Sequence, residues 1–243
     1  MTQDITTHPD AAPWVPVAYR ISDALRKFVD LVGRCGSWLI LPVVFITVFD
    51  AISRKISLAQ VWMVENVSGI FGSTILQELE WHFHTGLFAL VLGYGYIHNT
   101  HVRVDLIREN LSLRNKARLE LWGLTIFMIP FLSIIIYFAV DWIHTSWVLG
   151  EISASQVGLT HRWIIKAVLL FGLCVALVAG FSVWLQVVLI LWGPEDARFP
   201  LMTLEWPEDE TRIEGKERLV LEEDEKAGSA AKGDQPAAAA GAS

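Results

Sequence analysis

The sequence predicts an all-α integral membrane protein with four transmembrane helices and short amphipathic interfacial helices. Two observations favour this fold class: apolar residues make up 53% of the 243 residues, and charged residues are nearly absent from four long runs. A hydrocarbon core of about 30 Å takes about 20 helical residues to cross, and in lipid only a helix satisfies its backbone hydrogen bonds within one segment. A soluble bundle would need a polar face on each run, and none has one.

The four apolar runs give the approximate positions of the spans. They lie at about 35–53, 81–98, 119–141 and 163–193. Residues 35–193 are therefore expected to form a four-helix membrane domain, which residues 1–34 precede as an N-terminal segment. Glycines such as Gly93 in the second run and Gly172 in the fourth permit close helix packing, and Pro130 is a candidate bend in the third.

Residues 194–243 read as an acidic tail. From Glu195 onward the chain has 13 acidic and 6 basic residues, which accounts for the whole formal net charge of −7. Such a composition cannot bury enough apolar surface to order itself, so the tail is predicted to be largely disordered. The acidity of the chain therefore says little about its partners.

Lys and Arg beside the spans predict the orientation. Nine of them lie before the first helix or between the second and third, and four lie on the opposite side. This excess predicts that both termini are cytoplasmic. The long loop between the first two helices contains apolar residues that would let parts of it lie in the membrane interface as helix.

Asp50 is the sharpest ionisable residue within a predicted span. A carboxylate inside a membrane helix is a candidate for coupling to a proton or a sodium ion. Arg54 follows at i+4, so a local ion pair near the outer membrane face explains Asp50 as well. Lys166, near the outer end of the fourth helix, is expected to extend its ammonium group toward the interface.

Histidines and cysteines give weak cofactor signals. His84 and His98 have a spacing that resembles two-haem membrane cytochromes, but the other helices offer no facing histidines. His98 and His101 have a zinc-compatible offset without an evident third ligand, and Cys35 and Cys174 read as packing residues. No nucleophile–base pair, phosphate loop or nucleic-acid patch stands out. We therefore predict no enzyme, no catalytic residue, no cofactor, no metal and no nucleic-acid partner.

Three short motifs occur in order within this four-helix pattern. Arg54 ends the first helix, Glu78-Leu79 followed by Glu80-Trp81 opens the second, and His101-Val102-Arg103-Val104-Asp105 precedes the third. Over residues 76–123, and more broadly over about 25–193, the chain resembles the small membrane subunit (DctQ-like) of tripartite ATP-independent periplasmic (TRAP) transporters. The longer first external loop and the acidic tail depart from that family pattern.

The resemblance implies a small permease subunit in the bacterial inner membrane. Such a subunit would brace a large membrane subunit during symport, in which an organic acid delivered by a periplasmic binding protein is taken up with an ion. The large subunit, the binding protein and membrane lipids are the expected partners. The residues expected to make subunit or structural contacts at the two membrane faces are Asp50, Arg54, Glu78, Glu80, His101, Arg103 and Asp105.

Two other functions stay open from the sequence. One is a membrane-anchor subunit of a respiratory enzyme, which the lack of facing histidines weakens. The other is a small transporter that works alone, which the lack of visible internal repeats or broken helices weakens.

Overall fold

A computed structural model describes residues 3–4, 12–100, 111–155, 157–194 and 197–206 of the chain. Its contacts divide the chain into two units, residues 1–203 and 204–243, and the fold given below is that of the first unit. His101, Arg103, Asp105 and most of the predicted acidic tail lie outside the described residues.

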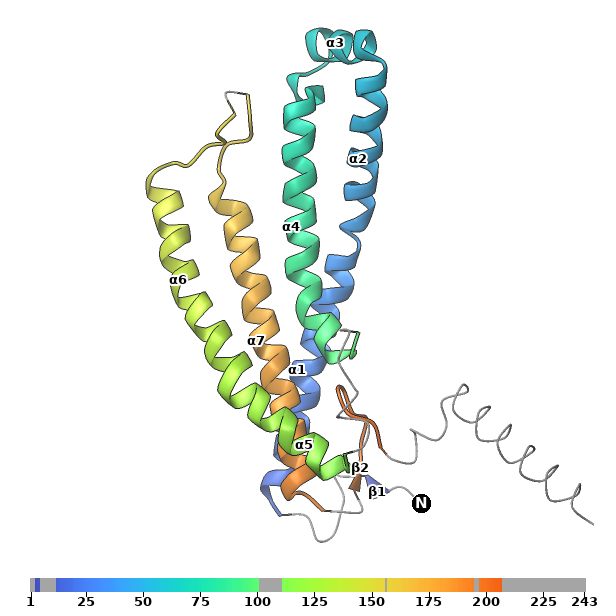
Figure 1. Ribbon diagram of the computed structural model, residues 1–243, viewed down its shortest axis with the longest axis vertical. Coiled ribbons are helices and arrows are strands. Elements are labelled where there is room, and N and C mark those ends of the chain that lie inside the picture. The colour runs from blue at the N-terminus through green and yellow to red at the C-terminus, as the bar shows by residue number, and fades with distance from the viewer. Residues whose placement is uncertain (1–2, 5–11, 101–110, 156, 195–196, 207–243) are drawn as a thin grey trace, which may run out of the picture. The chain divides into compact units, whose positions relative to one another are not determined.

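The described part of the first unit is almost entirely helical (Figure 1). Its α-helices are α1 (Trp14–Ser37), α2 (Ile40–Lys55), α3 (Ser57–Asn66), α4 (Ser73–Ile97), α5 (Leu113–Trp122), α6 (Ile129–Val148) and α7 (Trp163–Trp192). Its shorter elements are the 3₁₀ turn η1 (Gly69–Phe71), the π-helical turn η2 (Gly123–Met128) and the parallel pair β1 (Gln3–Asp4) and β2 (Ala197–Arg198).

Three helical stretches are long and apolar enough to cross a membrane, which identifies a multi-pass membrane protein. They are Trp14–Lys55, Leu113–Val148 and Trp163–Trp192. The 25-residue α4 corresponds to the predicted second span, but it begins at Ser73 rather than near residue 81. The polar residues Glu78, Glu80, His82 and His84 lower the hydropathy of its first half.

The long helices α2, α4, α7 and α6 lie in a row, and α1 packs against α4 and α7 (Figure 1). Glycines allow the closest approaches. A Cβ added at Gly172 on α7 would lie 2.6 Å from the carbonyl carbon of Ala89 on α4, and one added at Gly93 would lie 3.2 Å from the carbonyl oxygen of Val175. The expected glycine-mediated packing of the second and fourth helices is therefore confirmed at Gly93 and Gly172.

The helix before the first predicted span begins 21 residues earlier than that span, at Trp14. Its buried residues Val15, Ser22, Val29 and Gly36 recur every seven residues, so one face of α1 packs on the bundle. Ser22 and Ser182 connect α1 to α7 reciprocally: each hydroxyl donates to the other residue's carbonyl oxygen, at 2.9 and 2.8 Å. This contact explains why a charged segment continues as helix beside the bundle.

The third span is one continuous run of α5, η2 and α6. Pro130 is the second residue after the π-helical turn η2. A proline has no N–H to donate and its ring crowds the preceding turn, so the wider π turn accommodates it. At one end of the bundle, α3 lies across the ends of α2 and α4 (Figure 1), within the segment that connects these two helices.

Candidate functional site: polar contacts at the two ends of the bundle

Asp50 ties the end of α2 to the start of α4. The residue is 2% exposed, and Arg54 pairs with its Oδ2 one helical turn later. The hydroxyl of Ser73, the first residue of α4, donates to its Oδ1 at 2.9 Å. The expected pairing of Asp50 with Arg54 is confirmed, and both carboxylate oxygens accept a hydrogen bond.

Arg54 extends the same connection along α4. The side-chain oxygen of Gln77 accepts hydrogen bonds from the Arg54 guanidinium at 2.5 and 3.0 Å, in the amide orientation that satisfies both its oxygen and its nitrogen. The negative charge of Glu80, one helical turn after Gln77, attracts the positive charge of Arg54. The guanidinium therefore joins a buried carboxylate of α2 to polar side chains of α4.

Glu78 holds the connection between α6 and α7 against α4. Its carboxylate accepts hydrogen bonds from the Ser153 hydroxyl and from the backbone N–H of Leu159. A Cβ at Gly158 would lie 2.6 Å from Glu78 Oε1, so a glycine lets the loop approach the carboxylate. Two predicted site residues, Glu78 and Arg54, thus lie near the same end of α4 and serve different contacts.

Glu151 and Lys166 form a third contact at this end, which the sequence did not predict. Lys166 is 9% exposed, pairs with Glu151, and places its Nζ 4.1 Å from the ring centroid of Trp142. Its ammonium group therefore lies between α6 and the loop that follows α6. The hydrogen bond from Lys166 lowers the pKa of Glu151 below its ordinary value. Fifteen residues separate the pair, so no local spacing could have indicated it.

Two polar contacts connect helices at the opposite end. His98 Nε2 lies 2.9 Å from Oδ1 of Asp30, whose other oxygen pairs with Arg34 at 2.7 Å, so α4 is connected to α1. The Tyr96 hydroxyl donates to Glu120 at 2.9 Å and connects α4 to α5. His98, weighed above as a haem or zinc ligand, makes a contact between two helices.

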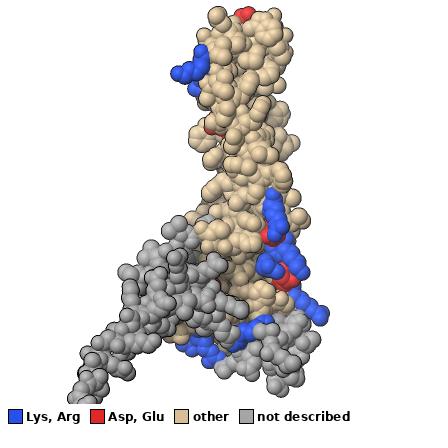
Figure 2. All heavy atoms as spheres, turned by 90° about the vertical axis from the view of Figure 1, so that its right-hand side faces the viewer, with Lys and Arg blue, Asp and Glu red and all other residues tan. Residues whose placement is uncertain are grey.

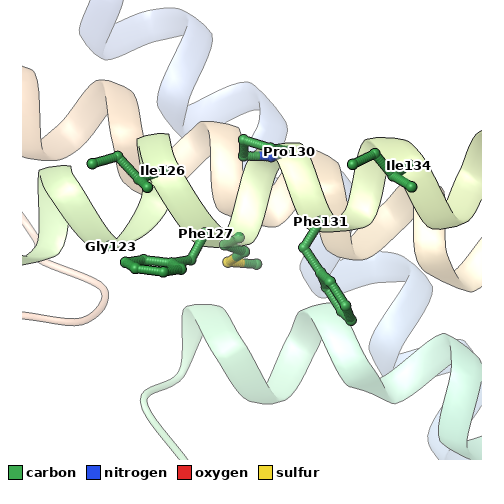
Figure 3. Close-up of a pocket in the computed structure, with 7 residues that line it drawn as sticks. Gly123, Ile126, Phe127, Pro130, Phe131 and Ile134 are labelled. Atoms are coloured by element: carbon green, nitrogen blue, oxygen red, sulfur yellow. The ribbon is translucent and has the colours of Figure 1, made fainter.

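A pocket of about 500 Å³ lies along the outer side of the third span (Figure 3). Phe127 and Phe131 project from the same side of the helix, one turn apart, and every residue of the lining is apolar. The residues that line it are Gly123, Ile126, Phe127, Met128, Pro130, Phe131 and Ile134. It offers no charged group to a polar substrate. Within the described ranges, no three His, Cys, Asp or Glu side chains are grouped to hold a metal ion.

Comparison with known proteins finds no match to a family model, a curated protein or a solved structure.

Proposed function

We propose that the chain crosses the membrane four times, with α2, α4, the α5–α6 run and α7 as the spans and both termini in the cytoplasm. The 25 residues of α4 would extend about 37 Å as helix, which exceeds a hydrocarbon core of about 30 Å. Its polar contacts to other elements lie toward its ends, at Glu78 and at His98, and no Asp, Glu, Lys or Arg occurs from Trp81 to Ile97. The distribution of Lys and Arg supports the orientation.

Within that topology, the proposed role is a small, non-catalytic permease subunit of a TRAP-type transporter in the bacterial inner membrane. The observation that carries this proposal is that polar side chains connect the elements of the bundle to one another. Asp50, Glu78, Glu151 and Asp30 each accept hydrogen bonds or ion pairs that connect one element of the bundle to another. A brace requires such internal connections, and it leaves its apolar outer faces for lipid and partner subunits.

The proposed mechanism follows from where these contacts lie. Connections at both ends of α4 resist relative sliding of α1, α2 and α7, so the bundle would act as one body. A large subunit packed against it could then move its transport domain relative to a fixed frame while an organic acid enters with its coupling ion. The external end, which α3 and the loop held by Glu78 form, would be available to a periplasmic binding protein.

Gentle extraction of the tagged full-length chain from its native membranes tests this function. A much larger multi-spanning protein recovered in equal amount is the expected result. The same preparation is examined for haem absorbance, flavin and iron–sulfur subunits. Recovery with those cofactors would replace the proposal by a respiratory membrane anchor, and recovery of the chain alone would also contradict it.

A further inference from the structure

An exposed apolar stripe runs along α1. Its residues are spaced alternately three and four apart, and most of them are large. The α1 stripe consists of Trp14, Val17, Ile21, Ala24, Phe28 and Leu31. Val17 is 56% exposed and Leu31 is 62% exposed. This 3.5-residue spacing is that of a helix surface which packs against another helix by knobs-into-holes contacts.

The α1 stripe lies beyond the hydrocarbon core. The continuous helical stretch Trp14–Lys55 has 42 residues and would be about 63 Å long, about twice the thickness of the core. All six charged residues of α1 fall between Arg20 and Arg34, whereas no charged residue occurs from Cys35 to Phe49. Charged side chains are costly inside lipid, so the uncharged part is the span and the stripe is left outside it.

Charges on the surface show the same division. Figure 2 shows Lys and Arg alternating with Asp and Glu over the lower part of one face, below a long band without Lys or Arg. The ion pairs within α1 include Lys27 with Asp23 and Arg34 with Asp30, each at 2.7 Å. An apolar surface beside such charges, outside the lipid, normally marks an interaction site.

The packing of α1 argues against a bilayer surface as the occupant. Ser22 and Ser182 hold α1 to α7, and Gly33 packs directly on Tyr94 of α4. Figure 1 shows α1 continuing along the direction of α2. To lie flat in the interface, α1 would have to break these contacts. A helix that projects along the bundle instead offers its stripe to another protein.

Charge then indicates the kind of partner. Three exposed basic residues recur every seven positions on α1: Arg20, Lys27 and Arg34. Each lies directly before a residue of the α1 stripe or, for Arg34, before the next position at the same spacing, Cys35. The pairs of Lys27 and Arg34 with aspartates are exposed and contribute little, and α1 has four basic but only two acidic residues. If two copies of the chain packed through their α1 stripes, Arg20, Lys27 and Arg34 of one copy would face the same basic residues of the other copy, or apolar residues such as Leu25. An acidic partner is therefore favoured over self-association.

We propose that the α1 stripe docks a helix of the large membrane subunit, which presents apolar residues at the same spacing and acidic side chains toward Arg20, Lys27 and Arg34. This inference rests on the proposed function and adds to it a second contact outside the membrane. It also gives a reason why the helix extends beyond the span: the extension forms an interface.

Two aspartates placed in the stripe test the inference. The full-length tagged variant Ile21→Asp/Phe28→Asp is compared with the matched apolar variant Ile21→Val/Phe28→Leu. Recovery of the large subunit should fall about tenfold with the aspartates, since central contacts carry most of an interface's affinity, and should be unchanged with the apolar pair. A photo-crosslinking residue at Val17 of the otherwise unaltered chain gives a measurement that does not depend on a folded aspartate variant. It should link to the large subunit in native membranes.

The outcomes separate this inference from the function on which it rests. If the unaltered chain recovers the large subunit, the inference fails when the aspartate variant recovers it equally well. It also fails when Val17 links to lipid, to a second copy or to residues 207–243. If the unaltered chain recovers no large subunit at all, the proposed function itself is overturned, and the inference with it.

Discussion

Gly33 on α1 lies directly against Tyr94 on α4. A Cβ added at residue 33 would overlap the Tyr94 Cβ and would lie 2.5 Å from its Cγ. The first two atoms of a side chain cannot swing away from such an overlap, so the two helices themselves would have to separate. This contact lies beside the polar contact of His98 with Asp30, and the two together determine how closely α1 follows α4.

Gly33→Ala should therefore destabilise the bundle by about 1–3 kcal/mol, the usual cost of forcing extra volume into a packed contact. Thermal unfolding of the purified chain in detergent measures this. Gly123→Ala is the matched control, because a Cβ at residue 123 would meet nothing within 4 Å. Equal melting temperatures for Gly33→Ala and the unaltered chain would show that α1 does not pack on α4 as described.

Arg54→Ala should destabilise the chain more than the loss of one surface charge would. It leaves the carboxylate of Asp50, which is 2% exposed, without its cation. Because the Arg54 side chain is itself 49% exposed, we expect the free energy of unfolding to fall by less than it would for a fully buried pair. Chemical or thermal unfolding checks the value, and Lys55→Ala, which removes the neighbouring charge, is the control.

The double variant Asp50→Asn/Arg54→Ala should be less destabilised than the two single effects add up to. The amide of asparagine can still accept from Ser73 while removing the unpaired charge. Strict additivity of the two single changes would mean that the ion pair contributes no coupling energy.

The contact of Glu151 with Lys166 should make stability depend on pH. Because Lys166 lowers the pKa of Glu151 in the folded chain, the contribution of this contact is complete above the ordinary glutamate pKa. It should be lost as the pH falls through the lowered, folded-state pKa. We expect Glu151→Gln to melt below the unaltered chain at neutral pH and to match it at the acid end. Melting curves at a series of pH values check this, and a gap that persists unchanged into acid would contradict it.

Hydropathy predicted the fourth span closely, at 163–193 against an observed α7 of Trp163–Trp192. That run is apolar on every face and ends at Gly193, so no competing signal obscured it. The apolar run placed the start of the second span at about residue 81, whereas α4 begins eight residues earlier, at Ser73, because the charged residues Glu78 and Glu80 interrupt the apolar pattern. Glu78 lies within the helix, and its carboxylate accepts hydrogen bonds from the loop that connects α6 and α7.

The site divides in the same way into local and distant contacts. The pairing of Asp50 with Arg54 follows from i+4 spacing and could be predicted. Its third member, Ser73, is 23 residues away, and Glu78 and Ser153 are 75 residues apart. Such partners depend on how the helices are arranged, which no periodicity in a single sequence encodes. The helical start at Trp14 was missed for a related reason, because burial of α1 depends on α7.

The reciprocal hydrogen bonds of Ser22 and Ser182 also have a consequence for biosynthesis. The two residues are 160 positions apart, in α1 and α7, which are the first and the last helices within the described residues. At roughly 5–20 residues per second, the ribosome needs roughly 10–30 seconds to make the second serine after the first. During that interval the partner face of α1 has no α7 to cover it. The end of the bundle that contains this contact therefore closes only after α7 has been made, and α1 is among the last helices to be locked in place.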